Sequence, residues 1–270
     1  MGAAASKTQI MGILNVTPDS FSDGGRFMNA EEIAEQAARL INAGADIIDV
    51  GGESSRPGAK AVSEEEELAR VLPAITAIRQ RHSVAISVDT TKAGVARRAI
   101  TAGADIINDI SGLRGDPEMI GVVRETGVRT VIMHMQGTPR TMQENPVYEN
   151  VVTEIRDFLQ RQVAWAVAQG VDKKNLIIDP GIGFGKTVQH NLSLLKHLAE
   201  FKQIGCPVLI GHSRKAFLGK TLGLEVTERD TATAIVSALC VTHGVDILRV
   251  HDVNGTAQAI RMTEAILTAP

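Results

Sequence analysis

The sequence predicts an α/β fold, a single (β/α)8 TIM barrel. Eight short apolar runs alternate with longer amphipathic stretches, and the runs consist mainly of Ile, Val and Leu. Continuous aliphatic runs are typical of parallel strands that are buried on both faces. Aromatic residues make up only 3% of the 270-residue chain and Gly contributes 25 residues, which favours an aliphatic core with many tight turns over a β-sandwich. Eight strand–helix units indicate the barrel, and an open doubly wound sheet is the alternative.

The elements are expected in alternation along the chain. The predicted strands cover residues 10–15, 47–50, 84–89, 106–109, 130–133, 176–179, 208–211 and 247–250. Apolar residues with helical spacing cover 30–43, 63–80, 92–101, 148–169, 191–201, 230–243 and 256–267. Ser63, with Glu66 three residues later, is typical of a capping box that opens a helix.

A short sequence phrase occurs three times. It reads "NAGADIIDV" at 42–50, "TAGADIIND" at 101–109 and, more loosely, "HGVDILRV" at 243–250. Each copy joins a helix end, a Gly and a short strand, as expected at the αβ turn of a repeated unit. Because no linker or shift of composition divides the chain, we expect one domain over residues 10–270 after a short flexible leader at residues 1–9.

Composition and charge argue against several classes of protein. The chain has 28 Lys and Arg against 31 Asp and Glu, a net charge of −3, so it lacks the basic footprint of a nucleic-acid-binding protein. No apolar run is long enough to cross a bilayer. Cys206 and Cys240 alone do not indicate a disulfide framework or a zinc site, and they suit the reducing cytoplasm. Residues 1–6 match the myristoylation pattern, but no polybasic segment follows, so a flexible leader is the preferred interpretation.

Polar side chains end nearly every predicted strand. They are Asn15, Asp49, Asp89, Asn108, Asp109, His134, Asp179, His212, Ser213, Arg249 and His251. In a TIM barrel, the carboxyl ends of the strands and the loops after them form the active-site face. A helix cap or a turn explains one such residue, whereas polar residues at the ends of all eight strands indicate one concave polar site.

Three long loops rich in Gly and Pro follow the first, second and sixth strands, at residues 15–25, 51–59 and 179–187. Loops on a rigid scaffold commonly carry binding residues. The third loop resembles a phosphate-binding P-loop, but Pro180 stands where that motif requires its first Gly. Proline has no N–H to offer a phosphate, so a nucleoside triphosphatase is disfavoured.

Basic residues gather where the seventh and eighth strands end. Arg214 and Lys215 follow the seventh strand, Arg249 and His251 belong to the eighth, and Arg56 in the second loop is a further candidate. Such a cluster suits a polyanionic group of the substrate, and ion pairs with the chain's carboxylates are an equal alternative. A Schiff base on Lys215 is a third interpretation.

The motifs resemble those of the bacterial dihydropteroate synthases. The matching segments are "MGILNVTPDSFSDGG" (11–25), "IIDVGGESSRPGA" (47–59), "SVDTTK" (87–92), "DIINDISG" (105–112), "MHMQGTPRTMQ" (133–143), "DPGIGFGKT" (179–187), "GHSRKAFLG" (211–219) and "RVHDV" (249–253). They occur in the family's order, and the resemblance covers residues 10–267. The resemblance implies a TIM barrel that joins p-aminobenzoate to 6-hydroxymethyl-7,8-dihydropterin diphosphate, giving 7,8-dihydropteroate and diphosphate in folate biosynthesis. It implies small-molecule substrates and no nucleic-acid or membrane partner.

The resemblance places a pterin pocket at the strand ends. Its residues are Asp89, Asn108, Ile110, Met133, Asp179, Phe184, Lys215 and Arg249. Carboxylate and amide groups suit the pterin ring, whose edge presents N–H donors beside a carbonyl. A guanidinium can stack on the face of the ring, and the aliphatic and aromatic members of the set would form its walls.

The resemblance also implies sites for the leaving group and the second substrate. Diphosphate is expected at Asn15, Arg56, Arg249 and His251, with Mg²⁺ as the cofactor and Asn15 beside the metal. The p-aminobenzoate slot is expected at Phe21, Ser55, Pro57 and Ala216, and the catalytic residues are expected to be Asp23, Arg56 and Lys215. In the implied mechanism diphosphate leaves first, Asp23 stabilises the remaining pterin methylene cation, and the aniline nitrogen then attacks.

Three features depart from the family pattern. Ser55 stands where the family often has Thr, Ala216 stands where it often has Ser, and the segment before Ile10 is short for the family's N-terminal hairpin. None of these departures removes a proposed catalytic group.

Two other functions are alternatives to the synthase, and the chain also carries a signal for its oligomeric state. A methyltetrahydrofolate:corrinoid methyltransferase shares the barrel but does not need the first two loops. A non-catalytic pterin-binding protein would keep Asp89, Asn108 and Asp179 but lose one or more of Asn15, Asp23, Arg56 and His251. All four are present, so this function is disfavoured. Small apolar residues crowd the helices at 230–243 and 256–267, the side through which family members dimerise, so we expect a twofold homodimer.

Overall fold

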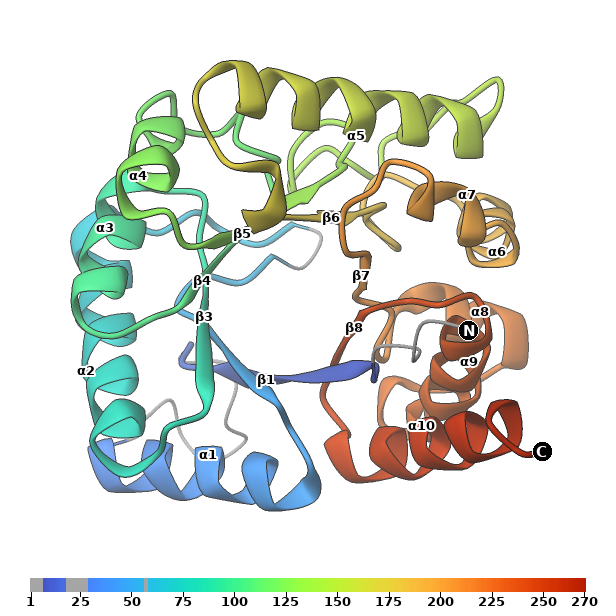
Figure 1. Cartoon of the computed structure of the whole chain (residues 1–270), viewed down its shortest axis with the longest axis horizontal. Coiled ribbons are helices and arrows are strands. Elements are labelled where there is room, and N and C mark those ends of the chain that lie inside the picture. Colours follow the sequence, from blue (N-terminus) through green and yellow to red (C-terminus); the bar gives the residue numbers. More distant parts are fainter. Residues whose placement is uncertain (1–6, 18–28, 56–57) are drawn as a thin grey trace.

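The fold is a nearly closed barrel of eight parallel strands with helices around it (Figure 1). The computed structural model describes residues 7–17, 29–55 and 58–270. The strands are β1 (Gln9–Asn15), β2 (Ile47–Gly51), β3 (Ala85–Asp89), β4 (Ile106–Asp109), β5 (Arg129–Met133), β6 (Leu176–Asp179), β7 (Leu209–Ile210) and β8 (Ile247–Val250). They pair in the order β6-β5-β4-β3-β2-β1-β8-β7, and a parallel bridge between Ile178 and Val208 joins the two ends. The predicted TIM barrel is confirmed, and the doubly wound sheet is excluded.

The helices lie outside the barrel and cover it (Figure 1). They are α1 (Ala30–Ala43), α2 (Glu64–Arg81), α3 (Ala93–Thr101), α4 (Met119–Thr126), α5 (Val151–Ala168), α6 (Val188–Lys196), α7 (Ala199–Lys202), α8 (Ala216–Leu222), α9 (Asp230–Thr242) and α10 (Val253–Leu267). Helix α4 falls outside the predicted helices: its eight residues make only about two turns, although Met119, Val122 and Val123 are buried at helical spacing. The helix predicted at 191–201 is instead two helices, α6 and α7, and α6 begins earlier because Thr187 and His190 form a capping box.

The capping box predicted at the start of α2 forms only in half. The Oγ of Ser63 accepts a hydrogen bond from the N–H of Glu66 at 3.1 Å. The carboxylate of Glu66 does not return to Ser63 but pairs with Arg70 one turn later. The cap therefore satisfies one backbone donor, and the helix end is tied to its own second turn.

The phrase that occurs three times has one structural role. Gly44, Gly103 and Gly244 all have positive φ after a helix and turn the chain into the next strand. Two residues after each Gly, an Asp accepts a backbone N–H from the neighbouring strand. The three pairs are Asp46 with Ile10 at 2.8 Å, Asp105 with Ile86 at 2.9 Å and Asp246 with Val208 at 2.6 Å. The repeat thus fixes the strands at the amino end of the barrel.

Alternate residues of each strand fill the barrel. One buried layer inside it consists of Met11, Ile47, Ile106, Val131, Ile177, Leu209 and Ile247. Since side chains alternate along a strand, positions two residues further on also face the interior. Those positions include Asp49, Asn108, Asp179 and Arg249. An aliphatic floor thereby lies beneath a set of polar side chains at the carboxyl ends of the strands.

Candidate active site

Four polar side chains from different strands meet inside the carboxyl end of the barrel. Arg249 donates from Nε to Oδ2 of Asp49 at 2.6 Å and from Nη2 to Oδ2 of Asp89 at 2.7 Å. The Nδ2 of Asn108 lies 3.3 Å from Oδ2 of Asp49. Strand register brings them together, because Gly51 pairs with Asp89 and Asp89 pairs with Asn108. Asp49 orients both the guanidinium and the amide, a role for which the sequence gives only its position at a strand end.

The electrostatics of this cluster leave Asp89 able to change its protonation state near neutral pH. Burial raises the pKa of Asp89 to about 7; Arg249 opposes this shift and the neighbouring Asp49 adds to it. Burial would lower the pKa of Arg249, but Asp49 and Asp89 outweigh burial and raise it, so the guanidinium stays charged. Asp89 can therefore either accept from or donate to a ring edge placed against it.

Asp179 and Lys215 form a second polar pair across the mouth from β3. The Oδ1 of Asp179 accepts the N–H of Gly181 at 2.7 Å, and its Oδ2 lies 4.0 Å from the point that a Cβ on Gly211 would occupy. Burial raises the pKa of Asp179, against the opposing effect of Lys215. Burial lowers the pKa of Lys215 to about 7, even though Asp179 favours its charged form. One carboxylate oxygen of Asp179 thus remains available to a ligand inside the barrel.

The loop after β6 is built around the stem of Lys215. The Nζ of Lys215 donates to the carbonyl of Ile182 and lies 4.2 Å from the centre of the Phe184 ring. Gly183 has φ +82°, and a Cβ there would lie 2.6 Å from Cδ of Lys215. Gly183 is therefore required both by the turn and by the lysine that crosses it.

Apolar side chains form a wall on the β4–β6 side of this mouth. Met133, Met135 and Met142 pack into one buried group, with Ile110 and Phe184 against it. Met133 pairs in register with Asp179, so the wall stands directly beside the carboxylate. An aromatic ring whose polar edge faces Asp179 would find its apolar contacts here.

The remaining described candidates lie along the rim. The hydroxyl of Ser213 is 2.9 Å from Nδ1 of His251 and also accepts the N–H of His251 at 3.1 Å. The Oδ1 of Asn15 lies 3.3 Å from the point that a Cβ on Gly51 would occupy, and Oδ2 of Asp89 lies 3.8 Å from the same point. Ala216 is exposed at the first position of α8.

Several strand-end residues point away from the interior and have structural roles. Asp109 accepts the N–H groups of Ser111 at 2.7 Å and Leu113 at 3.0 Å, so it shapes the turn after β4. The Nε2 of the fully buried His212 lies 3.0 Å from both the Thr233 carbonyl and the Ser237 hydroxyl of α9. Arg214 pairs with Asp230 at 2.6 Å. Arg214 therefore forms an ion pair, which was one of the alternatives for the basic residues. Of the polar residues at the strand ends, some face the interior of the barrel and others have structural roles outside it.

Lys186, in the loop that resembles a P-loop, is buried and anchors this loop to the one after β5. Its Nζ lies 3.1 Å from Nδ1 of His134 and donates to the Phe184 carbonyl at 2.9 Å. Burial lowers the pKa of Lys186 well below its usual value. Burial and the nearby charge of Lys186 together lower the pKa of His134 to about 2. The amine of Lys186 is therefore enclosed by protein groups, a role that the sequence analysis did not predict. The sequence signal for this role is a lysine inside a Gly-rich loop.

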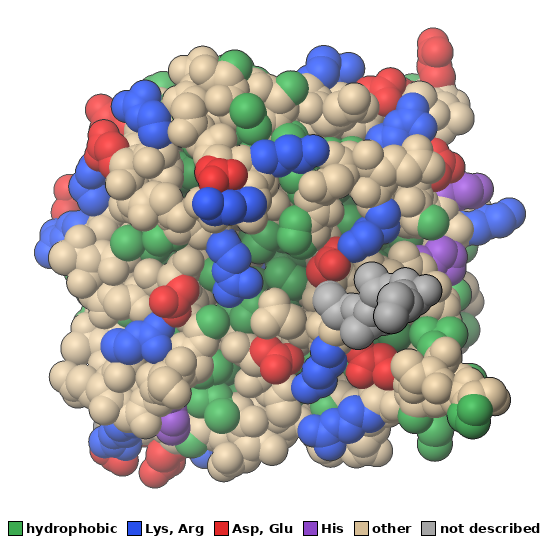
Figure 2. All heavy atoms as spheres, viewed as in Figure 1, with side chains coloured by type: hydrophobic (Ala, Val, Ile, Leu, Met, Phe, Trp, Pro, Cys, Tyr) green, Lys and Arg blue, Asp and Glu red, His purple; other side chains and the backbone are tan. Residues whose placement is uncertain are grey.

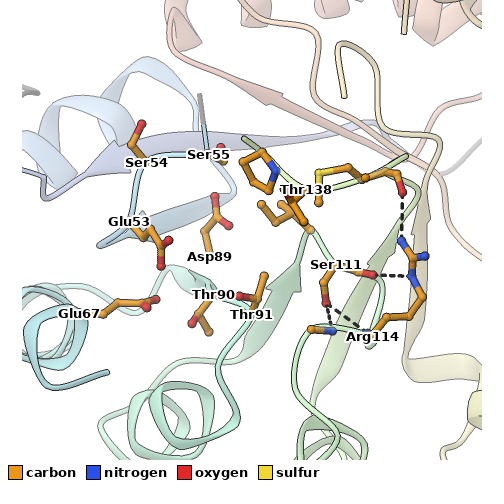
Figure 3. A pocket seen from close by; sticks show the side chains of 15 residues that line it. Glu53, Ser54, Ser55, Glu67, Asp89, Thr90, Thr91, Ser111, Arg114 and Thr138 are labelled. Atoms are coloured by element: carbon orange, nitrogen blue, oxygen red, sulfur yellow. Dashed lines mark hydrogen bonds between the residues drawn. The ribbon is translucent and has the colours of Figure 1, made fainter. Parts of the chain in front are cut away.

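A cavity of about 350 Å³ opens between the loops after β2, β3, β4 and β5 (Figure 3). Glu53, Ser54 and Ser55 line one side of it, and Ser111, Arg114 and Thr138 line the other. Asp89, Thr90 and Thr91 stand between the two sides (Figure 3). Ile110, which packs against the methionine group, also lines the cavity. The cavity therefore connects the second loop to the polar cluster inside the barrel.

Four predicted residues, Phe21, Asp23, Arg56 and Pro57, lie outside the described residues. Within the described ranges, no group of three or more His, Cys, Asp and Glu side chains is placed to hold a metal ion. In the same ranges, every helix is too short or too polar to cross a bilayer. Positive and negative side chains are interspersed over the face shown in Figure 2, in keeping with a net charge of −3.

Comparison with known proteins gives a consistent result. The family described as "Pterin binding enzyme" matches residues 11–251. The dihydropteroate synthase of Escherichia coli K12 is 48% identical over 264 residues, which cover 98% of this chain and 93% of that protein. The structure of the Yersinia pestis dihydropteroate synthase with a sulfonamide drug has a TM-score of 0.94 at 44% identity, covering 99% of this chain and 97% of that one. The Xanthomonas albilineans dihydropteroate synthase with 4-aminobenzoic acid has a TM-score of 0.92 at 42% identity, with 98% and 94% covered.

Proposed function

Given that the chain belongs to the dihydropteroate synthase family of pterin-binding enzymes, we propose that its strand-end side chains bind the pterin ring and hold the departing diphosphate. The enzyme condenses p-aminobenzoate with 6-hydroxymethyl-7,8-dihydropterin diphosphate, giving 7,8-dihydropteroate and diphosphate. The observation that carries the proposal for the site is the convergence of Asp49, Asp89, Asn108 and Arg249 above an aliphatic floor.

The pterin ring is proposed to lie between the polar cluster and the methionine wall. The free Oδ2 of Asp179 and the side chain of Asn108 face the interior, where they can meet the donor and acceptor groups of the ring edge. Asp89, with a pKa of about 7, can match either kind of group. Phe184 and Met133 supply the apolar contacts. The guanidinium of Arg249 is proposed to stack on the face of the ring. This arrangement buries the ring and leaves its methylene carbon toward the rim.

The reaction exchanges a C–O bond for a C–N bond at that methylene carbon. The C–O bond breaks with both electrons on the departing diphosphate, the aniline nitrogen supplies the pair for the new C–N bond, and this nitrogen then loses a proton. We propose that the C–O bond breaks first, so that the pterin briefly carries a methylene cation. Lys215, Arg249 and His251 stand where positive charge would favour the leaving group. Asp23 and Arg56, which lie outside the described residues, are proposed to act from their loops.

Mg²⁺ is the proposed cofactor, held through Asn15. The amide oxygen of Asn15 lies 3.3 Å from the point that a Cβ on Gly51 would occupy, and it is a hard oxygen donor of the kind that Mg²⁺ prefers. When bound, the ion supplies counter-charge to the diphosphate. The protein's own part is to place the Asn15 oxygen at the end of β1, while Lys215 and Arg249 would supply positive charge to the same anion.

The p-aminobenzoate slot is proposed to form at the rim between the second loop and the start of α8. Ser55 lines the cavity beside Asp89, and Ala216 is exposed next to Lys215. Phe21 and Pro57, outside the described residues, are proposed to complete it. Sulfonamides copy the aniline and the para acidic group of this substrate, so we propose that they compete for the same slot.

A binding experiment tests the order of events. We expect p-aminobenzoate to bind the free protein poorly and to bind tightly once a dihydropterin, diphosphate and Mg²⁺ are present, because the slot is completed by the loaded site. Isothermal titration calorimetry with and without each component measures this, and EDTA in place of Mg²⁺ is the control. Tight binding of p-aminobenzoate to the free protein would mean a preformed second site and would favour direct displacement.

A homodimer through α9 and α10 is the proposed assembly. These helices pack side by side (Figure 1), and they expose apolar side chains that a second copy would cover. The exposed side chains are Ile235 (65%), Leu239 (43%), Met262 (65%), Ile266 (67%) and Leu267 (57%). Because a twofold axis places one patch against its own copy, an apolar face of this kind is self-complementary.

Light scattering checks the assembly. We expect twice the subunit mass of 28.8 kDa, and we expect Ile235→Lys combined with Met262→Lys to give a single-subunit mass. Val147→Lys, at another exposed apolar position, is the matched control and is expected to stay dimeric. A single-subunit mass for the unmodified protein at micromolar concentration would contradict the proposal.

We also place the protein in the cytoplasm. Cys206 and Cys240 are both free and buried, as suits a reducing compartment.

A further inference from the structure

Lys92 connects the second loop to the wall of the barrel. It stands immediately before α3, and its Nζ donates to the carboxylate of Glu53 in the loop after β2. The same Nζ donates to Oε2 of Glu67 on α2 at 2.6 Å. One ammonium group thus links three segments of the chain. Lys92 is 39 residues from Glu53 and 25 residues from Glu67 in the sequence.

Glu67 fixes the position of the Lys92 ammonium. Its side chain is fully buried, and among the described residues its Oε1 has no hydrogen-bond partner, so the ammonium of Lys92 is the group that compensates its charge. Burial lowers the pKa of Lys92, but the hydrogen bonds to Glu53 and Glu67 outweigh burial and raise it. Lys92 therefore remains charged and is held from the Glu67 side.

The start of the second loop is pressed against the same helix. A Cβ on Gly52 would lie 2.7 Å from Cγ2 of Val71 and 3.1 Å from Cγ of Glu67. Nη1 of Arg70 donates to the Gly52 carbonyl at 2.8 Å. The backbone at Gly52 is thus fixed, whereas Glu53 is the side chain by which the next part of the loop is attached to the barrel.

Glu53 is followed after one residue by Ser55, and both line the cavity that leads to Asp89 (Figure 3). A change in the path of the chain at Glu53 therefore moves Ser55 relative to the rim. Asp89, Asn108, Asp179 and Arg249 lie on strands, so their positions do not depend on this attachment.

We propose that Lys92 is a positioning residue that, through Glu53, sets the second loop in the place where Ser55 contacts p-aminobenzoate. This inference rests on the proposed slot for p-aminobenzoate. It extends the site to an ion pair whose effect is expected on one substrate only.

Substitution at Glu53 tests the link without disturbing the buried pair. Glu53→Ala removes the attachment of the loop and leaves Lys92 paired with Glu67. We expect the KM for p-aminobenzoate to rise about tenfold, because a charge-assisted hydrogen bond is lost. The KM for the pterin diphosphate and the melting temperature are expected to stay almost unchanged. Glu53→Gln keeps an acceptor oxygen and is expected to recover part of the loss. Glu125→Gln, which breaks the surface pair with Arg97 on α3, is the matched control and is expected to change neither KM.

Ser55→Ala separates failure of this inference from failure of the proposed slot. If Ser55→Ala raises the KM for p-aminobenzoate and Glu53→Ala does not, the slot is correct and the positioning role of Lys92 is wrong. If neither variant changes this KM, the slot itself is wrong. Equal increases in both KM values for Glu53→Ala would also overturn the inference, because the effect would then be general.

Discussion

Lys215→Met is expected to lower kcat/KM about 100-fold while making the free protein more stable. The methionine keeps the stem that packs on Gly183 and Phe184 but removes the positive charge beside the substrate. The charge is unfavourable in the empty site, because burial lowers the pKa of Lys215 to about 7 despite the attraction of Asp179. Removing this buried charge raises the free energy of unfolding of the free protein, but it also removes a group that binds the anionic substrate. Stability and activity should therefore change in opposite directions.

The pH dependence of stability gives this prediction a clear sign. In the unfolded chain Lys215 keeps its proton up to its ordinary pKa of 10.5, whereas in the folded protein it loses the proton near pH 7. Between these values the unfolded state binds more protons, so this lysine makes stability rise with pH from about 7 to 10.5. The difference in melting temperature between Lys215→Met and the unmodified protein should be largest at pH 7 and below, and should shrink as the pH rises. Lys220→Met, at an exposed position of α8, is the control and should change neither activity nor this profile. A difference that does not depend on pH would contradict a buried charge at Lys215.

The strand order and the aliphatic core of the barrel could be predicted from the sequence, because eight aliphatic runs alternating with helices have few solutions. The direction of each strand-end side chain could not. Asn108 faces the interior and its neighbour Asp109 turns outward to the loop after β4. Since the strands are buried on both faces, the apolar pattern does not set which alternate positions face the barrel axis.

The lysines that connect loops to the barrel, Lys186 and Lys92, could not be predicted from sequence patterns either. Lys186 and His134 are 52 residues apart, and Lys92 and Glu53 are 39 residues apart. Lys186 lies in a Gly-rich loop, but no local feature of the sequence identifies the partner of either lysine, and only the closure of the barrel brings the partners together. The positions of Asp89 and Asp179 at the strand ends, by contrast, follow from the end of each aliphatic run, and the structure places both beside Arg249 or Lys215.

Asp179→Asn is expected to reduce the affinity for the pterin diphosphate about 100-fold or more. The amide oxygen of the new side chain can still accept the N–H of Gly181, so the loop after β6 should keep its path. Its NH₂ group would replace the free Oδ2 that faces the interior and would meet the N–H groups of the ring edge donor to donor. Asp109→Asn, at the end of β4 where the side chain turns outward, is the matched control: it should lower the melting temperature but leave affinity unchanged.

Calorimetric titration of the pterin diphosphate into the unmodified protein, Asp179→Asn and Asp109→Asn tests most directly whether the inward-facing strand ends form the pterin site. The arrangement of Asp179 beside Lys215 and the methionine wall predicts that only Asp179→Asn loses binding. Unchanged affinity in Asp179→Asn, with the fold intact, would contradict it and would place the pterin elsewhere on the rim.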